Sequence, residues 1–328
     1  MILAKVKGQP LRIEARERGL ALVLVLWLLS LMMIMAASFS LTVDREASVI
    51  AGIKSNARAT AAAESGLSYA EMMLLHPDQN KRWHTDGSIY EIQYLDALVR
   101  IRMLAESGKI DINKADQKQL ASLMRLAPLT EEEQTPLVSA ILDWRDADDL
   151  INIEGAEKQQ YRDAKLKYQP RNKPFQSIEE LQMVLGMNES VLDWLEPRIT
   201  VYSGSSQVDL SKASREVLLT VPGIDPDLIE QYLELRRQSA ITGTPMQPFA
   251  FGSISLSGAG GEVGAVEIIS EALLDDGSQS IIKAVIAKNT NNPSSLFQIL
   301  NWKSDVKDGD SLFSEEMSSF LVTPNAES

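Results

Sequence analysis

The sequence contains no cysteine and only two histidines among its 328 residues. The lack of cysteine excludes disulfide bonds, thiolate metal sites and cysteine nucleophiles. With His76 and His84 alone, an imidazole-based triad or a histidine-rich metal site has too few residues. The formal charge of −13 argues against broad binding of a phosphate backbone, because such binding needs clustered Lys and Arg. No pair of carboxylates has a spacing that singles it out for acid–base chemistry, so we do not expect an enzyme.

Positive charge is concentrated at the N-terminus. Residues 1–19 carry a net charge of +3, residues 20–43 carry no charge, and everything after them carries −16. About 20 apolar residues are enough to cross a bilayer as a helix, so residues 20–43 predict a membrane span. A basic flank stays on the cytoplasmic side, which places the acidic remainder across the membrane. A cleaved secretory signal peptide is the alternative, but its apolar region is shorter than this one.

The helical pattern continues beyond the apolar run. Apolar and small residues recur at helical spacing from residue 44 to residue 75, and Pro77 provides a natural end. Gly52 and Gly66 weaken this helix. We expect its outer half to pack small residues against a partner or a sheet, because a helix so rich in alanine is marginal alone in water. The face expected to bind partners consists of Ala57, Ala61, Ala62, Leu67 and Ala70.

Beyond residue 76 the pattern changes twice. Residues 89–103 alternate apolar and polar side chains, which predicts two strands that turn near Asp96-Ala97. From residue 111 the pattern is helical, with a helix through Met124 that Asn113 should cap and a second helix over 131–145. The segments DINKADQKQLASL (111–123) and VDLSKASREVLLTV (208–221) resemble each other, which indicates repeated helix–turn–helix units. Strands return after residue 243, with a hairpin at 275–277 and a strand in SLFQILNWK.

These patterns predict an α+β fold. A long N-terminal helix packs on an antiparallel sheet, and a large all-α domain of the helix-hairpin-helix or SAM-like type is inserted between strands. The expected parts are a basic leader (1–19), the membrane part of the helix (20–43), its outer part (44–76), first strands (77–110), a helical insertion (111–240) and final strands (241–328). Trp144, Trp194 and Trp302 lie in apolar surroundings and are expected in cores.

The boundary between the basic segment and the apolar run resembles the processing site of type IV pilin-like proteins. It reads RERGLALVL over residues 16–24. In that family a peptidase cuts after the glycine on the cytoplasmic side and the new N-terminus is methylated, which implies cleavage between Gly19 and Leu20. The family usually has glutamate at the fifth mature position, where this sequence has Leu24. The missing glutamate, the run LALVLVLWLL and the helical insertion together resemble the type II secretion protein K family.

This resemblance implies a minor pseudopilin at the tip of the type II secretion pseudopilus, which initiates assembly and supports export of folded proteins across the outer membrane. The partners it implies are the minor pseudopilins I and J, H as a further candidate, the prepilin peptidase, the inner-membrane secretion platform and the lipid bilayer. Leu24 then marks the tip, because a carboxylate in lipid needs a partner and the topmost subunit has none above it. The location implied is the inner membrane, crossed once, with the N-terminus cytoplasmic and the bulk periplasmic.

The segment from residue 218 to residue 237 looks like a helix-hairpin-helix, a motif that can hold a DNA phosphate with backbone amides. In DNA-binding examples a second glycine stands where this sequence has Asp225, whose carboxylate would repel the phosphate. We therefore expect a packing motif and no nucleic-acid partner. The alternative function is a membrane-anchored DNA receptor of the competence type, which salt-dependent binding of duplex DNA would favour. An anchored hydrolase is a second alternative.

An acidic cluster follows residue 142. Oxygen-rich side chains suit Ca²⁺, but Leu150 and Ile151 stand where an EF-hand needs a ligand and a glycine, so the segment is not an EF-hand. Two interpretations stay open: a solvated acidic loop, or an irregular calcium site. The candidate ligands are Asp143, Asp146, Asp148, Asp149, Glu154 and Glu157.

Overall fold

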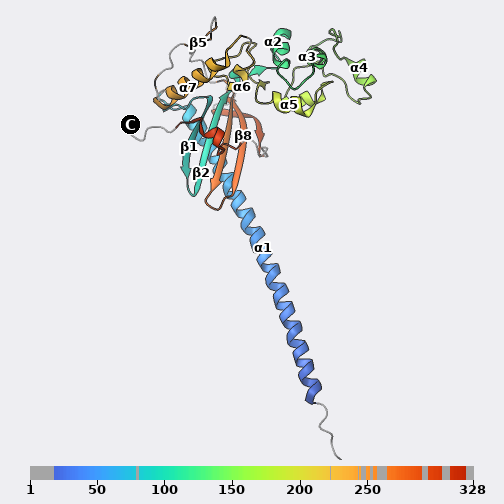
Figure 1. Ribbon diagram of the computed structural model, residues 1–328, viewed down its shortest axis with the longest axis vertical. Coiled ribbons are helices and arrows are strands. Elements are labelled where there is room, and N and C mark those ends of the chain that lie inside the picture. Colours follow the sequence, from blue (N-terminus) through green and yellow to red (C-terminus); the bar gives the residue numbers. More distant parts are fainter. Residues whose placement is uncertain are drawn as a thin grey trace, which may run out of the picture. The chain divides into compact units, whose positions relative to one another are not determined.

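The computed structural model describes residues 18–78, 81–221, 223–242, 244, 249–251, 254–256, 264–289, 295–304 and 311–322. The chain divides into two compact units, Met1–Ser55 and Asn56–Ser328. The helix α1 (Arg18–Leu74) has 57 residues and contributes to both units (Figure 1). The expected long N-terminal helix is therefore confirmed.

The part of α1 in the first unit is apolar, and its side chains are exposed. Every large apolar side chain from Leu22 to Val43 is exposed. By length and composition, α1 is the one helix among the described residues that could cross a membrane, and none of its apolar stretch is buried. A helix that is apolar on all sides and contacts no protein needs an apolar solvent, so α1 fits a single membrane anchor.

The second unit contains a six-stranded sheet in the order β10-β1-β2-β7-β8-β9. The strands are β1 (Asp86–Tyr94), β2 (Ala97–Ala105), β7 (Val266–Leu274), β8 (Gln279–Lys288), β9 (Phe297–Lys303) and β10 (Leu321–Val322). Neighbouring strands are antiparallel except β10, which pairs in parallel with β1, so the sheet is mixed at that edge. Both expected hairpins are confirmed, and Gly277 adopts the positive φ of 84° that the β7–β8 turn requires.

One face of the sheet carries the part of α1 that belongs to the second unit. The buried residues Ala59, Ala63 and Leu74 of the helix share a core with strands β1, β2, β7, β8 and β9. Gly66 allows the helix to approach the sheet closely, because a Cβ at this position would lie 2.8 Å from Val99 Cγ1 and still closer to Ser270 Oγ. The short helix α8 (Glu315–Ser318) precedes β10, and Met317 packs against a small separate core of Ile89, Ile269 and Leu312.

The helical insertion follows β2 and precedes β7, as expected from the sequence. Its helices lie together beyond one end of the sheet (Figure 1). It comprises η2 (Glu106–Gly108), β3 (Ile110–Asp111), α2 (Gln117–Met124), α3 (Glu131–Arg145), α4 (Lys158–Asp163), η3 (Ile178–Met183), α5 (Glu189–Leu195), β4 (Ile199–Thr200), α6 (Arg215–Leu218), α7 (Pro226–Thr242), β5 (Phe249–Phe251) and β6 (Ile254–Leu256).

The insertion has its own cores. Trp144 is fully buried in the larger one, where its ring lies 5.9 Å from that of Tyr161. A smaller core around Tyr232 joins α6 and α7. The prediction that Asn113 caps α2 is wrong: Asp116 is the N-cap and accepts a bond from Gln119 N at 2.8 Å. Asn113 instead exchanges two hydrogen bonds with the backbone of Phe175, because a long-range partner outcompetes the local one.

Candidate functional site

The expected processing site lies at the beginning of α1. Gly19 and Leu20 belong to its first turn, and residues 1–17 of the expected leader lie outside the described residues. Leu24 is exposed on the helix surface, and its neighbours are apolar. At the fifth position after the expected cleavage site, the apolar helix therefore presents a hydrocarbon side chain to its surroundings and no carboxylate.

The face of α1 expected to bind partners divides between two environments. Ala62, Leu67 and Ala70 are buried against the protein's own sheet, so the expectation that they contact a partner is wrong. The helix needs to bury one apolar stripe, and the sheet of the same chain provides the surface. Ala57 and Ala61 lie on the exposed side and remain accessible. The helix is also tied to the sheet by an ion pair between Arg58 and Asp96.

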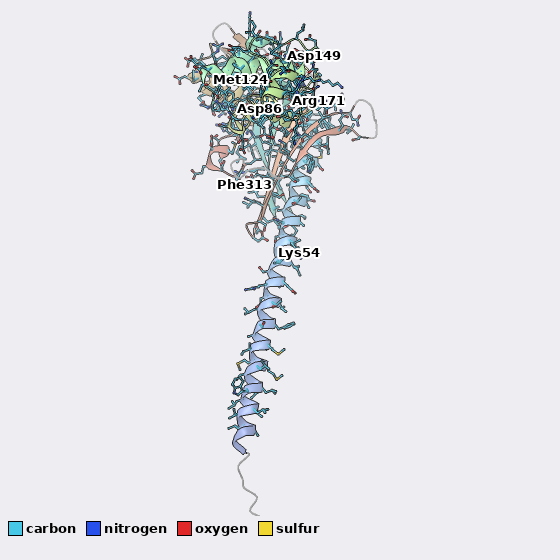
Figure 2. The ribbon with its side chains drawn as sticks, turned by 90° about the vertical axis from the view of Figure 1, so that its right-hand side faces the viewer. Lys54, Asp86, Met124, Asp149, Arg171 and Phe313 are labelled. Atoms are coloured by element: carbon cyan, nitrogen blue, oxygen red, sulfur yellow. The ribbon has the colours of Figure 1, made fainter. Side chains whose placement is uncertain are left out.

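The acidic loop between α3 and α4 is organised by Asp143. This side chain is fully buried and accepts hydrogen bonds from Asn152 N at 3.1 Å, Asn152 Nδ2 and Ala156 N at 2.7 Å. Gly155 packs so closely that a Cβ there would lie 2.9 Å from Asp143 Cγ. Asp143 therefore acts as the internal anchor of the loop, whose position on the helical insertion is marked by Asp149 in Figure 2.

Two carboxylate oxygens beside this anchor are buried and have no hydrogen-bond partner: Asp146 Oδ1 and Glu157 Oε1. Burial and the negative charges of Asp143, Asp146 and Asp149 raise the pKa of Glu157 to about 7. Burial, together with neighbouring carboxylates, also raises the pKa of Asp146. The site therefore favours a bound proton or cation.

The other candidate ligands are arranged differently. Asp148 accepts from Leu150 N at 2.9 Å, and Asp149 accepts from Asn172 Nδ2 at 3.0 Å. Glu154 is exposed and has a positive φ of 61°. Among the described residues no three acidic side chains converge as a ready-made metal site. The donor chemistry suits Ca²⁺, but binding would require some of these side chains to turn inward.

The helix-hairpin-helix segment consists of α6, a turn with Gly223 at φ 83°, and α7. Arg236 of α7 is buried and donates to Ala213 O at 2.7 Å and to Asp86 O at 2.6 Å. Arg237 pairs with Glu234 on the same helix at 2.7 Å. Both arginines that could have met a phosphate are thus engaged within the chain, as a packing motif requires.

A buried ion network that the sequence pattern did not predict joins the insertion to the sheet. Lys109 Nζ lies 2.9 Å from Glu106 Oε1 and 3.0 Å from Glu267 Oε2, and Glu106 also accepts from Thr200 of β4. Although burial opposes the charged form, these two carboxylates raise the pKa of Lys109. Burial would raise the pKa of Glu267, but Lys109 and Lys283 lower it to about 2. The sequence signal was the pair of charged residues, Glu267 and Glu271, in the otherwise mainly apolar strand VEIISEALL, of which Glu267 belongs to the network.

The network continues outward through Lys303 at the end of β9. Its Nζ lies 2.9 Å from Glu196 Oε1 and 2.6 Å from Glu179 Oε1, both in the helical insertion. Alternating charges therefore run from the buried Lys109 to the surface. A chain of charge-assisted hydrogen bonds of this kind fixes orientation between two layers more than it adds net stability.

Residues 95–204 match the family described as type II secretion system (T2SS), protein K. Among solved structures, the chain is similar to the crystal structure of the GspK-GspI-GspJ complex from the enterotoxigenic Escherichia coli type 2 secretion system. The identity is 11%, the TM-score is 0.49, and the likeness covers 80% of this chain and 98% of that chain. Because the identity and the TM-score are this low, the partners in that complex are not evidence for the partners of this chain. Comparison with curated proteins found no match.

Proposed function

We propose that this protein is a minor pseudopilin at the tip of the type II secretion pseudopilus. There it initiates assembly and supports export of folded proteins across the outer membrane. The match of residues 95–204 to the type II secretion system protein K family supports the proposal. The observation that carries the proposal is α1, whose first part is bare, apolar and uncharged while its last part packs on the chain's own sheet. Such a helix can move from lipid into a bundle of similar helices without unfolding the second unit.

The tip position is supported by two features. Leu24 gives the helix no carboxylate to neutralise the N-terminus of another subunit, and a carboxylate in lipid would be costly without that partner. The insertion adds bulk at the sheet end that is opposite the Arg58–Asp96 contact, because it follows the end of β2 remote from Asp96. Of the five residues expected to contact partners, Ala57 and Ala61 are exposed and remain available to neighbouring minor pseudopilins.

Processing by the prepilin peptidase provides the first experiment. The mature protein should begin at Leu20 and carry a methyl group on its N-terminus, as intact mass spectrometry would report. Gly19→Val should leave residues 1–19 attached and block secretion, whereas Gly8→Ala, a matched change within the same leader, should be processed normally. A mature N-terminus at any other residue would end the pseudopilin proposal.

The tip position has a separate experiment. Leu24→Glu should reduce secretion or place the subunit within the fibre, because the new carboxylate seeks an N-terminus above it. Leu24→Met, which keeps the position apolar, should secrete normally. Equal secretion by both variants would contradict the tip assignment while leaving the family assignment intact.

A second proposal concerns the acidic loop. The unpartnered oxygens of Asp146 and Glu157 support a Ca²⁺ site in which they, with Asp143 and other carboxylates of the loop, provide oxygen ligands. Added Ca²⁺ should raise the melting temperature and a chelator should lower it again. Glu157→Gln should abolish this shift, whereas Asp163→Asn, a neighbouring exposed site, should preserve it. If Ca²⁺ does not change the melting temperature, the proposed site is refuted and the segment is a solvated acidic loop.

A further inference from the structure

The two edges of the six-stranded sheet differ. At one edge β10 is only two residues long. At the other edge β9 has seven residues, and among the described residues only β8 pairs with it. Among the described residues no other strand pairs with the outer side of β9, although Phe297 O accepts a hydrogen bond from Ser295 Oγ at 2.5 Å. The occupant that such an open edge accepts is an extended polypeptide strand.

The side chains along β9 do little to prevent such an addition. Four large apolar side chains are exposed in and just before the strand: Leu296 (66%), Ile299 (56%), Leu300 (37%) and Trp302 (40%). Natural edge strands are commonly guarded by charged residues or proline. The one charged residue of β9 is Lys303 at its end, which pairs with Glu179 and Glu196, and Phe297–Trp302 contains no charged residue or proline. One feature that disfavours strand addition is present. The β8–β9 pairing shifts register at a β-bulge, which leaves Leu300 without a partner on β8.

The register shows which face the exposed side chains occupy. Ile299 pairs with Ile286 and Trp302 pairs with Ala284, and the two β8 residues belong to the core beneath α1. Cross-strand partners share a face, so Ile299 and Trp302 extend the α1 face of the sheet beyond its covered area. Trp302 is thus exposed, contrary to the expectation that it lies in a core. The exposed apolar surface and the open edge lie on the same strand.

We propose that β9 is a docking edge to which a partner protein adds an extended, uncharged, apolar strand. The absence of charge from Phe297 to Trp302 specifies a neutral strand, because a charged side chain facing Ile299 or Trp302 would lose water without gaining a partner. The choice of partner rests on the proposed function: the strand belongs to a neighbouring minor pseudopilin. Addition continues the sheet across the subunit boundary and covers Ile299 and Trp302, which are exposed among the described residues.

The experiment uses the full chain and the full-length minor pseudopilins I and J of the same system, purified together in detergent. Ile299→Lys and Trp302→Lys place a charge on the docking edge and should weaken the complex at least about tenfold, as loss of a central interface residue does. Leu126→Lys is the matched control, because Leu126 is 52% exposed on the helical insertion, and it should bind as the unmodified chain does. Thermal unfolding of each variant shows whether the fold is retained.

Hydrogen exchange separates strand addition from contact between side chains alone. In the complex, backbone amides of β9 should gain at least about tenfold protection, because outward N–H groups acquire acceptors. Unchanged exchange in β9, or binding that both Lys variants preserve, would overturn the docking edge while leaving the pseudopilin role intact. Absence of any complex with I and J would overturn the docking edge and its pseudopilin partner together, whereas correct processing at Gly19 would still support the pseudopilin role.

Discussion

Replacing Gly66 by alanine should destabilise the second unit even though alanine is the better helix former. Gly66 lies in the part of α1 that packs on the sheet, and a Cβ there would meet Val99 Cγ1 at 2.8 Å and Ile101 Cγ1 at 3.3 Å. Ser270 Oγ would lie closer still, within a distance that real Cβ atoms do not adopt. The helix must therefore move away from the sheet, or the strands beneath it must shift.

The magnitude follows from two opposed effects. Alanine gains about 1 kcal/mol over glycine in a helix interior. Forcing an extra methyl group into a packed core costs about 1–3 kcal/mol, and with two contacts inside 3.0 Å the upper half of that range applies. We expect a net loss of about 1–2 kcal/mol in the free energy of unfolding. For a unit of this size, such a loss lowers the melting temperature by roughly 2–8 °C.

The assay is thermal unfolding of the full chain in detergent, followed by tryptophan fluorescence. Trp83 reports directly, because it lies in the core beneath α1 and stacks on Tyr90 with ring centroids 4.3 Å apart. Gly52→Ala is the matched control, since a Cβ at Gly52 would meet nothing within 4 Å, and it should not lower the melting temperature. Adding Ser270→Ala to Gly66→Ala removes the closest contact and should restore part of the loss. If Gly66→Ala melts at or above the temperature of the unmodified chain, the close helix–sheet packing described here is refuted.

Three further outcomes follow from the buried charges. Lys109→Met should destabilise the fold by about 3 kcal/mol in chemical denaturation, because it leaves Glu106 and Glu267 buried with one cation fewer. Since the folded pKa of Glu267 is lowered to about 2, its contribution is present above its ordinary range near pH 4.5 and is lost as the pH falls toward 2; melting of Glu267→Gln should depend less on pH across that window. Gly155→Ala should loosen the acidic loop, because its Cβ would collide with the Asp143 carboxylate, and limited proteolysis should then cut the loop sooner. Unchanged stability of Lys109→Met would contradict the first prediction, and unchanged pH dependence of Glu267→Gln would contradict the second. Unchanged cleavage of Gly155→Ala would contradict the third.

Much of the fold could be predicted because its signals are local. An uncharged run after a basic segment predicts the membrane helix from length and composition alone. Asp-Gly at 276–277 predicts the β7–β8 hairpin, because glycine supplies the positive φ that this turn adopts. Glu133 three residues after Thr130 closes a capping box that begins α3. In each case residues within a few positions of one another decide the structure, so their order along the chain is enough.

The functional surfaces could not be predicted from the sequence, because they depend on contacts between residues far apart in the chain. Glycines at 52 and 66 look alike in the sequence, yet only the second touches the sheet. Small residues of α1 looked equally suited to a partner, but the chain's own strands bury Ala62 and Ala70 and leave Ala57 and Ala61 free. Trp302 has apolar neighbours in sequence, but its strand is the last in the sheet, so no further strand among the described residues covers it.

The sequence by itself determined the elements of this protein: a bare apolar helix, hairpins with their turns, and capped helices between two sets of strands. Tertiary structure alone decided which side of α1 is covered, that Lys109 lies between Glu106 and Glu267, and that β9 ends the sheet. The physical reason is that burial and charge pairing depend on residues far apart in the chain. Glu267 meets Lys109 only because the insertion returns the chain to the strand beside the one it left.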